Sequence, residues 1–272
     1  MAGRIPRPTD SPALVHREPG QATDIAAPTV ASPDAAPTEQ FVVPRDELPR
    51  HVAIIMDGNR RWAKARGQIE MDGHAAGVEA IREIIRHSVR RGIAVLSLYA
   101  FSREHWARSD EEVGGLLFLL EKVIRNETEE LKAQGARVRL LGRIEELPPE
   151  TGASIQTALD ATSGGRRLQL NIAFNYSGRT ELVDAARKLI SQGLRPDQVD
   201  EETLAAALYT AGMPDPDIVI RTGGDERLSN FLIWQAAYAE FYFSPILWPD
   251  FGPAAFDASL VEYASRQRRF GR

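Results

Sequence analysis

The stretch 54–62, IIMDGNRRW, places an acid and two arginines directly after an apolar run of the kind found in buried strands. Read alone, Asp57 followed by Gly58 favours a turn that caps the next helix. The same residue types can also hold a phosphate group, because guanidiniums bind phosphate oxygens in pairs and an aspartate can bind a divalent metal. The ends of the other strands decide between these interpretations.

Polar loops of similar composition follow three further apolar runs. DGNRRW follows HVAIIM, SREHWARS follows SLYAF, NYSGR follows NIAF, and RTGGDERLSN follows DIVI. Ligands of parallel sheets bind beyond the carboxyl ends of the strands, so these loops would meet at one edge. The side chains expected to converge there are Asp57, Asn59, Arg61, Ser102, Arg108, Arg179, Arg221, Arg227 and Ser229. One carboxylate among guanidiniums favours a diphosphate site with a divalent metal, and Gly58, Gly223 and Gly224 would let backbone N–H groups approach phosphate oxygens.

The elements that must position these loops alternate between strands and helices. Strands are expected at 51–56, 94–101, 136–142, 168–174 and 217–221. Helices are expected at 74–92, 110–134, 149–162, 179–191, 200–208 and 253–268. This alternation predicts an α/β domain with a mostly parallel central β-sheet flanked by helices.

Composition narrows the function further. The 272 residues carry a net charge of −5, and this acidic balance argues against nucleic-acid binding. The chain has no cysteine, which excludes disulfides and thiolate metal sites. It contains no P-loop, and no GxGxxG follows a strand, which disfavours NTPases and dinucleotide enzymes. No apolar run approaches the ~18 residues of a membrane span, and a secretory signal is lacking, so we expect a cytoplasmic protein.

The folded domain is expected to start after a tail. Residues 1–46 are rich in proline, alanine and threonine and lack sustained periodicity. Such a segment buries too little apolar surface to offset the entropy lost on ordering. We therefore predict a disordered tail at 1–46 and a single catalytic domain at 47–272.

Together these stretches resemble the cis-prenyltransferases, the family of undecaprenyl diphosphate synthase, from about residue 48 to the C-terminus. The matching segments are HVAIIMDGNRRWAKARG, GHAAG, LSLYAFSREHW, NIAFNYSGRTELVDA, PDPDIVIRTGGDERLSNFLIWQAAYAEFYF and LWPDF. The resemblance implies an Mg²⁺-dependent transferase that condenses isopentenyl diphosphate with farnesyl, geranyl or dimethylallyl diphosphate. The cis polyprenyl product would grow into an apolar tunnel. A homodimer and peripheral membrane contact through the lipid product are also implied.

The resemblance assigns roles to individual residues. Asp57 and Glu240 are expected to bind the metal, and Asp57 and His105 to be catalytic. The allylic diphosphate is expected to contact Gly58, Asn59, Arg60, Arg61, Trp62, Glu70 and His74. The loop that closes over the substrates is expected to contribute Ser102, Arg103, Glu104, Trp106 and Arg108. Isopentenyl diphosphate is expected to contact Arg221, Arg227, Leu228 and Ser229, with Arg269 and Gly271 supporting its site.

Three positions depart from the family pattern: His105 replaces asparagine, Glu70 replaces arginine, and Ser177 replaces glycine. With its ordinary pKa of about 6.5, His105 could serve as a base, alter the proton-removal step or simply be tolerated. Glu70 should weaken diphosphate binding unless Arg60 compensates. Two alternatives to regular cis elongation follow, namely irregular coupling to a branched prenyl diphosphate and a non-catalytic partner subunit. The retained acid and arginines argue against the second.

Overall fold

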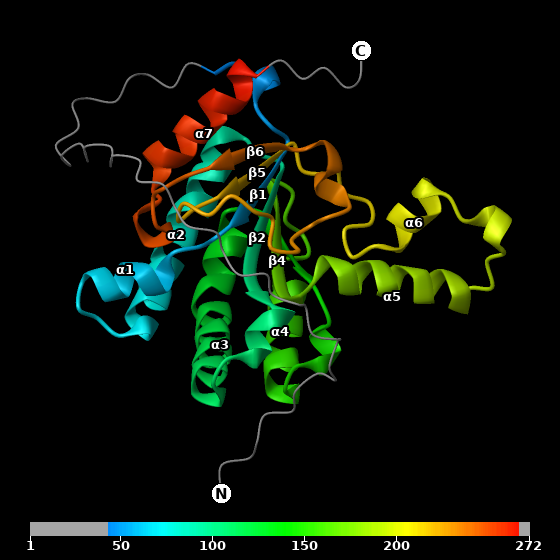
Figure 1. Cartoon of the computed structure of the whole chain (residues 1–272), viewed down its shortest axis with the longest axis horizontal. Helices are drawn as coiled ribbons and strands as arrows, with labels where there is room; N and C mark the ends of the chain where they lie inside the picture. The colour runs from blue at the N-terminus through cyan, green and yellow to red at the C-terminus, as the bar shows by residue number, and fades with distance from the viewer. Residues whose placement is uncertain (1–42, 267–272) are drawn as a thin grey trace, which may run out of the picture.

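The computed structural model describes residues 43–266, in which one sheet is covered by helices (Figure 1). Most of the tail predicted at 1–46 lies outside the described residues, as do Arg269 and Gly271. The last residues of that predicted tail lead into the 3₁₀ turn Arg45–Glu47 just before the first strand.

The sheet has six strands in the order β3-β4-β2-β1-β5-β6, and every neighbouring pair is parallel. The strands are β1 His51–Ile55, β2 Val95–Ser102, β3 Ala136–Leu141, β4 Leu168–Tyr176, β5 Ile218–Arg221 and β6 Glu240–Phe243. All five predicted strands are confirmed to within two residues, and the α/β class is confirmed with them. Strand β6 was not predicted. Because all strands run the same way, their carboxyl ends share one edge.

Helices flank this sheet. They are α1 Asn59–Ala65, α2 Glu70–Arg91, α3 Asp110–Ala133, α4 Pro149–Thr162, α5 Gly178–Ser191, α6 Glu201–Ala207 and α7 Pro253–Ser265. The six predicted helices are confirmed, although α2 begins four residues earlier than expected. The short α1 was not predicted; its N-cap is Gly58, whose left-handed φ of 115° suits glycine. Within residues 43–266, no helix combines the length and the apolar character needed to cross a membrane.

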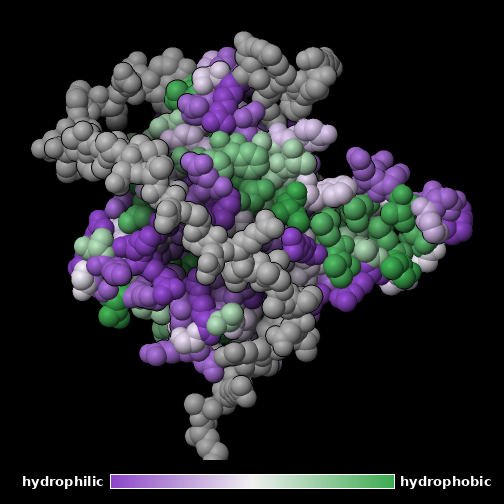
Figure 2. Space-filling model, in the orientation of Figure 1, coloured by the Kyte–Doolittle hydropathy of each residue, from purple (hydrophilic) through white to green (hydrophobic). Residues whose placement is uncertain are grey.

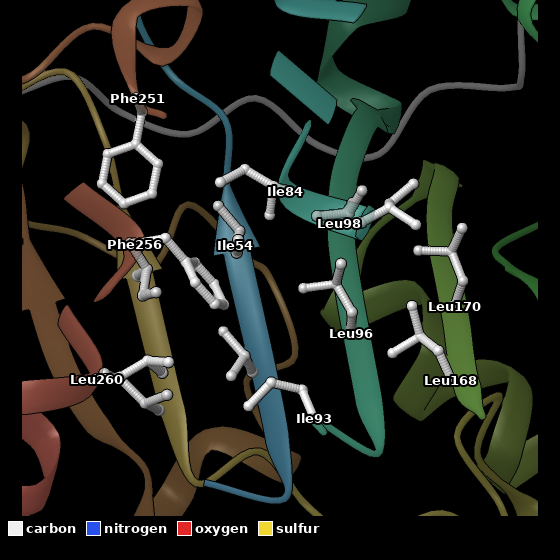
Figure 3. Packing of buried hydrophobic residues seen from close by; sticks show 14 of the residues in the cluster. Ile54, Ile84, Ile93, Leu96, Leu98, Leu168, Leu170, Phe251, Phe256 and Leu260 are labelled. Carbon is white, nitrogen blue, oxygen red and sulfur yellow. The ribbon is translucent and has the colours of Figure 1, made fainter. Parts of the chain in front are cut away.

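The central strands are buried on both faces, which explains their continuous apolar sequences. Val52 and Ile54 of β1 pack with Ile84 of α2 and with Phe256 of α7 (Figure 3 labels all but Val52). The alternate β1 residues Ala53 and Ile55 pack on the opposite face in a cluster that includes Phe231 and Leu232. Burial of such side chains stabilises the fold by about 1.5–3 kcal/mol each and holds the strand ends in fixed positions.

Helices α5 and α6 extend away from the sheet as an arm, residues 178–207 (Figure 1). A small core of Ala185, Leu189, Ala207 and the adjoining Leu208 holds the helices of the arm together. It also leaves apolar side chains in contact with solvent, and Figure 2 shows the resulting hydrophobic surface. Its exposed large apolar residues are Val183, Ile190 and Val199.

Candidate active site

The carboxyl ends of the central strands open into a cavity of about 1390 Å³. Its mouth is lined by polar side chains from the loop after β1 and from β2, β5, α1 and α2, whereas its body runs between α2, α3 and the sheet. The body is lined by Val78, Ile81, Ile85, Leu98, Leu116, Leu119, Leu120, Val123, Ile124, Leu131, Val138, Leu140, Leu170, Ile172 and Phe174. The predicted apolar tunnel is therefore present, and we call this body the apolar channel.

Asp57 lies at the mouth, just beyond β1, where two guanidiniums hold its carboxylate. Its Oδ2 accepts a hydrogen bond from Arg221 Nη2 at 2.7 Å, and its Oδ1 accepts one from Arg61 Nη2 at 3.1 Å. Thr222 fixes the turn, since its Oγ1 accepts from the Asp57 N–H at 3.0 Å and donates to the Asp57 carbonyl at 2.8 Å. Burial tends to raise the pKa of Asp57, but Arg221 and Arg61 outweigh it, so the pKa is lowered and the carboxylate is ionised.

Arg221 connects Asp57 with the loop that follows β5, and its side chain is only 4% exposed. Its Nη1 donates to Ser229 Oγ at 2.7 Å and to the Arg227 carbonyl at 2.6 Å. Its Nη2 also reaches Asp225 Oδ2 at 3.1 Å, which accepts from Arg227 Nη2 at 2.7 Å. The structure thus brings together the predicted Arg221, Arg227, Ser229 and Asp57. Sequence reasoning missed Asp225, although this acid stands in the same loop.

The residues predicted to hold the allylic diphosphate line the other side of the mouth. Arg60 forms an ion pair with Glu70, Nη2 to Oε1 at 2.7 Å, and both side chains are about half exposed. Two buried polar atoms of residues that line the cavity, Asn59 Oδ1 and His74 Nε2, have no hydrogen-bond partner among the described residues. Such atoms usually have a partner in the functional state, so this wall suits a polar ligand. Burial, and next the charge of Arg108, lower the pKa of His74.

His105 lies on the cavity wall at the end of β2, together with Ser102 and Arg108. Its Nδ1 accepts a long hydrogen bond, 3.4 Å, from the backbone N–H of Ser102. Burial, and then the charges of Arg108 and His74, lower the pKa of His105 to about 3. A neutral ring whose Nδ1 accepts a hydrogen bond carries its proton on Nε2. This geometry therefore favours a hydrogen-bond donor at His105 over the general base considered from the sequence.

Both predicted tryptophans lie off the cavity wall. Trp106 is 6% exposed and donates from Nε1 to Asn175 Oδ1 at 2.8 Å, within a core cluster beside the channel. Trp62 donates from Nε1 to Asp250 Oδ1 at 2.7 Å, and the Arg66 guanidinium lies 4.1 Å from its ring centre. Trp106 supports the loop of His105 and Trp62 holds α1 in place, so their roles are structural in this arrangement.

Three other residues that were predicted to contact substrates make contacts with other parts of the protein instead. Arg103 forms an ion pair with Glu146. Glu104 accepts a hydrogen bond from Asn230 Nδ2 at 3.0 Å, and Leu228 packs against the core cluster that contains Phe231. Together these contacts tie the loops after β2 and β5 to the body. Arg179, expected at the same edge, is exposed and does not line the cavity.

The structure does not bring Glu240 to Asp57 within one chain. Glu240 begins β6 opposite Ile218, the first residue of β5, whereas Asp57 lies with Arg221 at the other end of that strand. Three residues of strand separate the two levels by about 10 Å. Glu240 instead forms an ion pair with Arg266 at 3.0 Å. One ion could not have both carboxylates of a single chain as ligands in this arrangement.

The glycine pair after β5 serves a different purpose from the one expected. The N–H of Gly223 donates to the Ile246 carbonyl at 2.8 Å, and that of Gly224 donates to the Ser244 carbonyl at 2.9 Å. Neither N–H is left to bind phosphate. A Cβ at Gly223 would come within 2.9 Å of the Asp57 carbonyl, so glycine allows this loop to approach the turn at Asp57.

A divalent metal at this site would have Asp57 as its protein ligand, with Asp225 the next carboxylate on the cavity wall. The part of the chain that the structure describes contains no cluster of three or more histidine, aspartate or glutamate side chains arranged around a metal. Mg²⁺ does not need such a cluster, because it commonly binds one or two carboxylates together with substrate phosphate oxygens. The donor set at the mouth fits this mode of binding.

Known proteins are similar to this chain in sequence and in fold. The family pattern described as "Putative undecaprenyl diphosphate synthase" matches residues 55–271. The chain is 45% identical to isoprenyl transferase 2 of Bradyrhizobium diazoefficiens over 92% of this chain and 96% of that protein, and 50% identical to isoprenyl transferase of Brucella abortus over 82% and 89%. Lavandulyl diphosphate synthase from Lavandula x intermedia, solved with dimethylallyl diphosphate, is 38% identical, with a TM-score of 0.81 over 84% of this chain and 100% of that chain. The chain therefore belongs to the undecaprenyl diphosphate synthase (isoprenyl transferase) family and is a prenyltransferase.

Proposed function

We propose that this enzyme condenses isopentenyl diphosphate with an allylic diphosphate, with Mg²⁺, to give a cis polyprenyl diphosphate. The observation that carries the proposal is the placement of Asp57, Arg221 and Ser229 at a charged mouth that opens into an apolar channel. A substrate with a diphosphate head and a growing hydrocarbon tail needs this pairing of environments. The two bacterial relatives named above, both isoprenyl transferases, support the same reaction class.

In the proposed reaction the bond between C1 and the diphosphate oxygen of the allylic substrate breaks, and the double bond of isopentenyl diphosphate attacks C1. Loss of a proton then leaves the new double bond. Arg61, held beside Asp57, would stabilise the negative charge that develops on the leaving diphosphate, and Arg221 would bind the diphosphate of isopentenyl diphosphate next to it; fixed guanidiniums stabilise such charge without reorganising. Mg²⁺ bound through Asp57 would polarise the phosphate oxygens. His105 would donate its Nε2 proton in a hydrogen bond to a substrate oxygen.

The proposal includes a homodimer. Support comes from the arm, residues 178–207, whose exposed Val183, Ile190 and Val199 form an apolar surface on a projecting element (Figure 2). Surfaces of this kind commonly mark protein–protein contacts. A cytoplasmic location, with peripheral membrane contact as the lipid product leaves, belongs to the same proposal because the product joins a polar head to a long hydrocarbon.

Irregular coupling is the second candidate. Its support is the likeness to lavandulyl diphosphate synthase, which was solved with dimethylallyl diphosphate. In this reaction two allylic diphosphates would join to a branched product without isopentenyl diphosphate. The size of the whole cavity, about 1390 Å³ with its mouth, favours elongation, because a short branched product would leave much of it unfilled.

Product analysis tests both candidates. Purified protein is incubated with Mg²⁺, isopentenyl diphosphate and farnesyl, geranyl or dimethylallyl diphosphate in turn. We expect a series of linear cis products that disappears when the metal is chelated. A branched product from dimethylallyl diphosphate alone would establish irregular coupling instead. No prenyl product under any of these conditions would overturn the proposed function.

The Arg60–Glu70 ion pair gives a prediction about the allylic substrate. Glu70 competes with the diphosphate for the guanidinium of Arg60. We expect Glu70→Gln to lower KM for the allylic diphosphate by about two- to fivefold, the range of a half-exposed ion pair, with little change in kcat. Steady-state kinetics with the allylic substrate varied give both constants.

Glu262→Gln is the matched control, because Glu262 is also about half exposed and pairs with Arg266 away from the cavity. We expect it to leave KM unchanged. A Glu70→Gln enzyme with unaltered or higher KM would show that Arg60 does not contact the allylic diphosphate.

A further inference from the structure

The loop after β5 contains a turn whose backbone conformation is unusual for its residues. Ser229 and Asn230 have φ angles of 47° and 65°, in the left-handed region that residues other than glycine seldom adopt. Ser229 lines the cavity, and its Oγ accepts the 2.7 Å hydrogen bond from Arg221. Because such a conformation persists only where surrounding contacts hold it, the contacts of this turn determine where the Ser229 hydroxyl lies.

The side chain and carbonyl of Asn230 anchor this turn. The carbonyl accepts a hydrogen bond from the Gly178 N–H at 2.9 Å, and Oδ1 accepts one from the Arg179 N–H at 3.0 Å. Nδ2 donates to Ser177 Oγ at 2.8 Å and to Glu104 Oε1 at 3.0 Å. A side-chain amide has two N–H donors and one acceptor oxygen, so all of these groups are engaged and the amide is held in one orientation.

These hydrogen bonds join the turn to two other segments of the site. Glu104 belongs to the 3₁₀ turn Arg103–Ala107, which also carries His105 of the cavity wall. Ser177 is the buried N-cap of α5, directly after β4. The amide of Asn230 therefore fixes the loops after β2, β4 and β5 relative to one another, beside the mouth of the cavity.

Ser177 is a feature of this chain, since the family pattern has glycine at this position. Its φ of −153° is extended backbone that any residue adopts, so the local conformation requires neither residue. The hydroxyl, however, accepts hydrogen bonds from the Asn230 amide and, at 3.3 Å, from the Thr180 N–H. Glycine would remove the acceptor for one N–H of that amide, and the turn would lose part of its anchor.

We propose that Ser177 and Asn230 are positioning residues for isopentenyl diphosphate, because their hydrogen bond holds the Ser229 hydroxyl where that substrate binds. This inference rests on the proposed function, in which Ser229 and Arg221 contact the diphosphate of isopentenyl diphosphate. Neither Ser177 nor Asn230 lines the cavity, so both act through the turn and not by touching the substrate.

Removing the link should weaken the binding of one substrate only. We expect Ser177→Ala to raise KM for isopentenyl diphosphate by about two- to tenfold, the range for one neutral hydrogen bond, with KM for farnesyl diphosphate unchanged. Asn230→Gly keeps a residue suited to the left-handed turn but removes the whole amide, so its rise in KM should exceed about tenfold. Steady-state kinetics with each substrate varied in turn give the two KM values.

A double-mutant cycle tests whether the two residues act through one hydrogen bond. Asn230→Gly already removes the partner of the Ser177 hydroxyl, so adding Ser177→Ala should raise KM for isopentenyl diphosphate by less than about twofold more. Additive effects of the two substitutions would show that Ser177 does not act through Asn230, and the inference would then be wrong.

Asp200→Ala is the control for the loss of a helix cap. Asp200 caps α6 in the same arm, where its Oδ1 accepts from the Thr203 N–H at 2.8 Å, and it does not line the cavity. We expect both KM values of this variant to stay within about twofold of the wild type. A rise equal to that of Ser177→Ala would trace the effect to the cap and overturn the inference.

The remaining outcomes separate this inference from the proposed function. A folded Ser177→Ala enzyme with the wild-type KM for isopentenyl diphosphate overturns the inference alone, as does an equal rise of KM for both substrates. If the wild type makes no prenyl product from isopentenyl diphosphate, the proposed function fails and the inference fails with it. Thermal unfolding checks that each variant is folded. Should Asn230→Gly not melt cooperatively, the comparison of Ser177→Ala with Asp200→Ala decides.

Discussion

Replacing Asp57 by asparagine is expected to lower the rate of prenyl transfer by about 10³-fold, the scale on which removing one preorganised charge at a reacting centre acts. The substitution keeps the shape of the side chain and removes the charge that pairs with Arg221 and Arg61. Under the proposed function it also removes the carboxylate that would hold Mg²⁺ at the leaving diphosphate. Turnover is measured with both substrates saturating, across a range of Mg²⁺ concentrations.

Asp250→Asn is the matched control, since Asp250 also pairs with an arginine, Arg66, on the surface beside α1 and lies off the cavity wall. Its rate should stay within about twofold of the wild type. Thermal unfolding of both variants checks that each is folded. Wild-type turnover in a folded Asp57→Asn enzyme would remove Asp57 from the catalytic centre.

Replacing Arg221 by alanine is expected to damage stability and activity together. The guanidinium, 4% exposed, binds two carboxylates, the Ser229 hydroxyl and the Arg227 carbonyl. We expect a loss of about 3 kcal/mol in the free energy of unfolding, the lower end of the range for a broken buried ion pair, because the carboxylates of Asp57 and Asp225 keep some contact with water. Activity should fall by more than about 10²-fold. Urea unfolding and steady-state kinetics measure the two effects.

Arg227→Ala provides the comparison in the same loop. Its side chain is 63% exposed and makes one ion pair, with Asp225. We expect a stability change below about 1 kcal/mol, with a raised KM for isopentenyl diphosphate. Equal stability losses in the two variants would contradict the central position given to Arg221.

Much of the fold was predictable because its main elements carry strong periodic patterns. The buried β1 run HVAII and the apolar stripe of α2 are long enough to identify alone. Strand β6, only four residues, owes its conformation to pairing with β5 and shows no pattern of its own. Helix α1 has seven residues, too few to be stable in isolation. It forms because it packs on α2, where a Cβ at Gly77 would come within 2.4 Å of Asn59 Oδ1.

In the candidate site, too, some features could be predicted from the sequence and others could not. Asp57 and Arg221 could be placed together from the sequence, because they end neighbouring parallel strands and the topology alone brings them to one edge. The direction of a side chain within a loop could not be predicted. Trp106 turns into the core, and the Gly223 N–H is taken by the Ile246 carbonyl. Burial in the folded protein, and next the charges of Arg108 and His74, lower the pKa of His105, so its ordinary pKa was a poor guide.

The ion pairs of Asp57 affect the order in which ligands can load. A metal ion that reaches the protein alone must compete with Arg221 and Arg61 for a carboxylate that is already neutralised. A bound diphosphate would accept hydrogen bonds from both guanidiniums and so free the carboxylate for a metal. The metal would in turn strengthen diphosphate binding, because it reduces the repulsion among the phosphate oxygens. Thermodynamic linkage makes this help reciprocal and equal in size. Under the proposed function, the resting ion pairs therefore lower the affinity of Asp57 for a metal alone, and substrate and metal are expected to bind cooperatively.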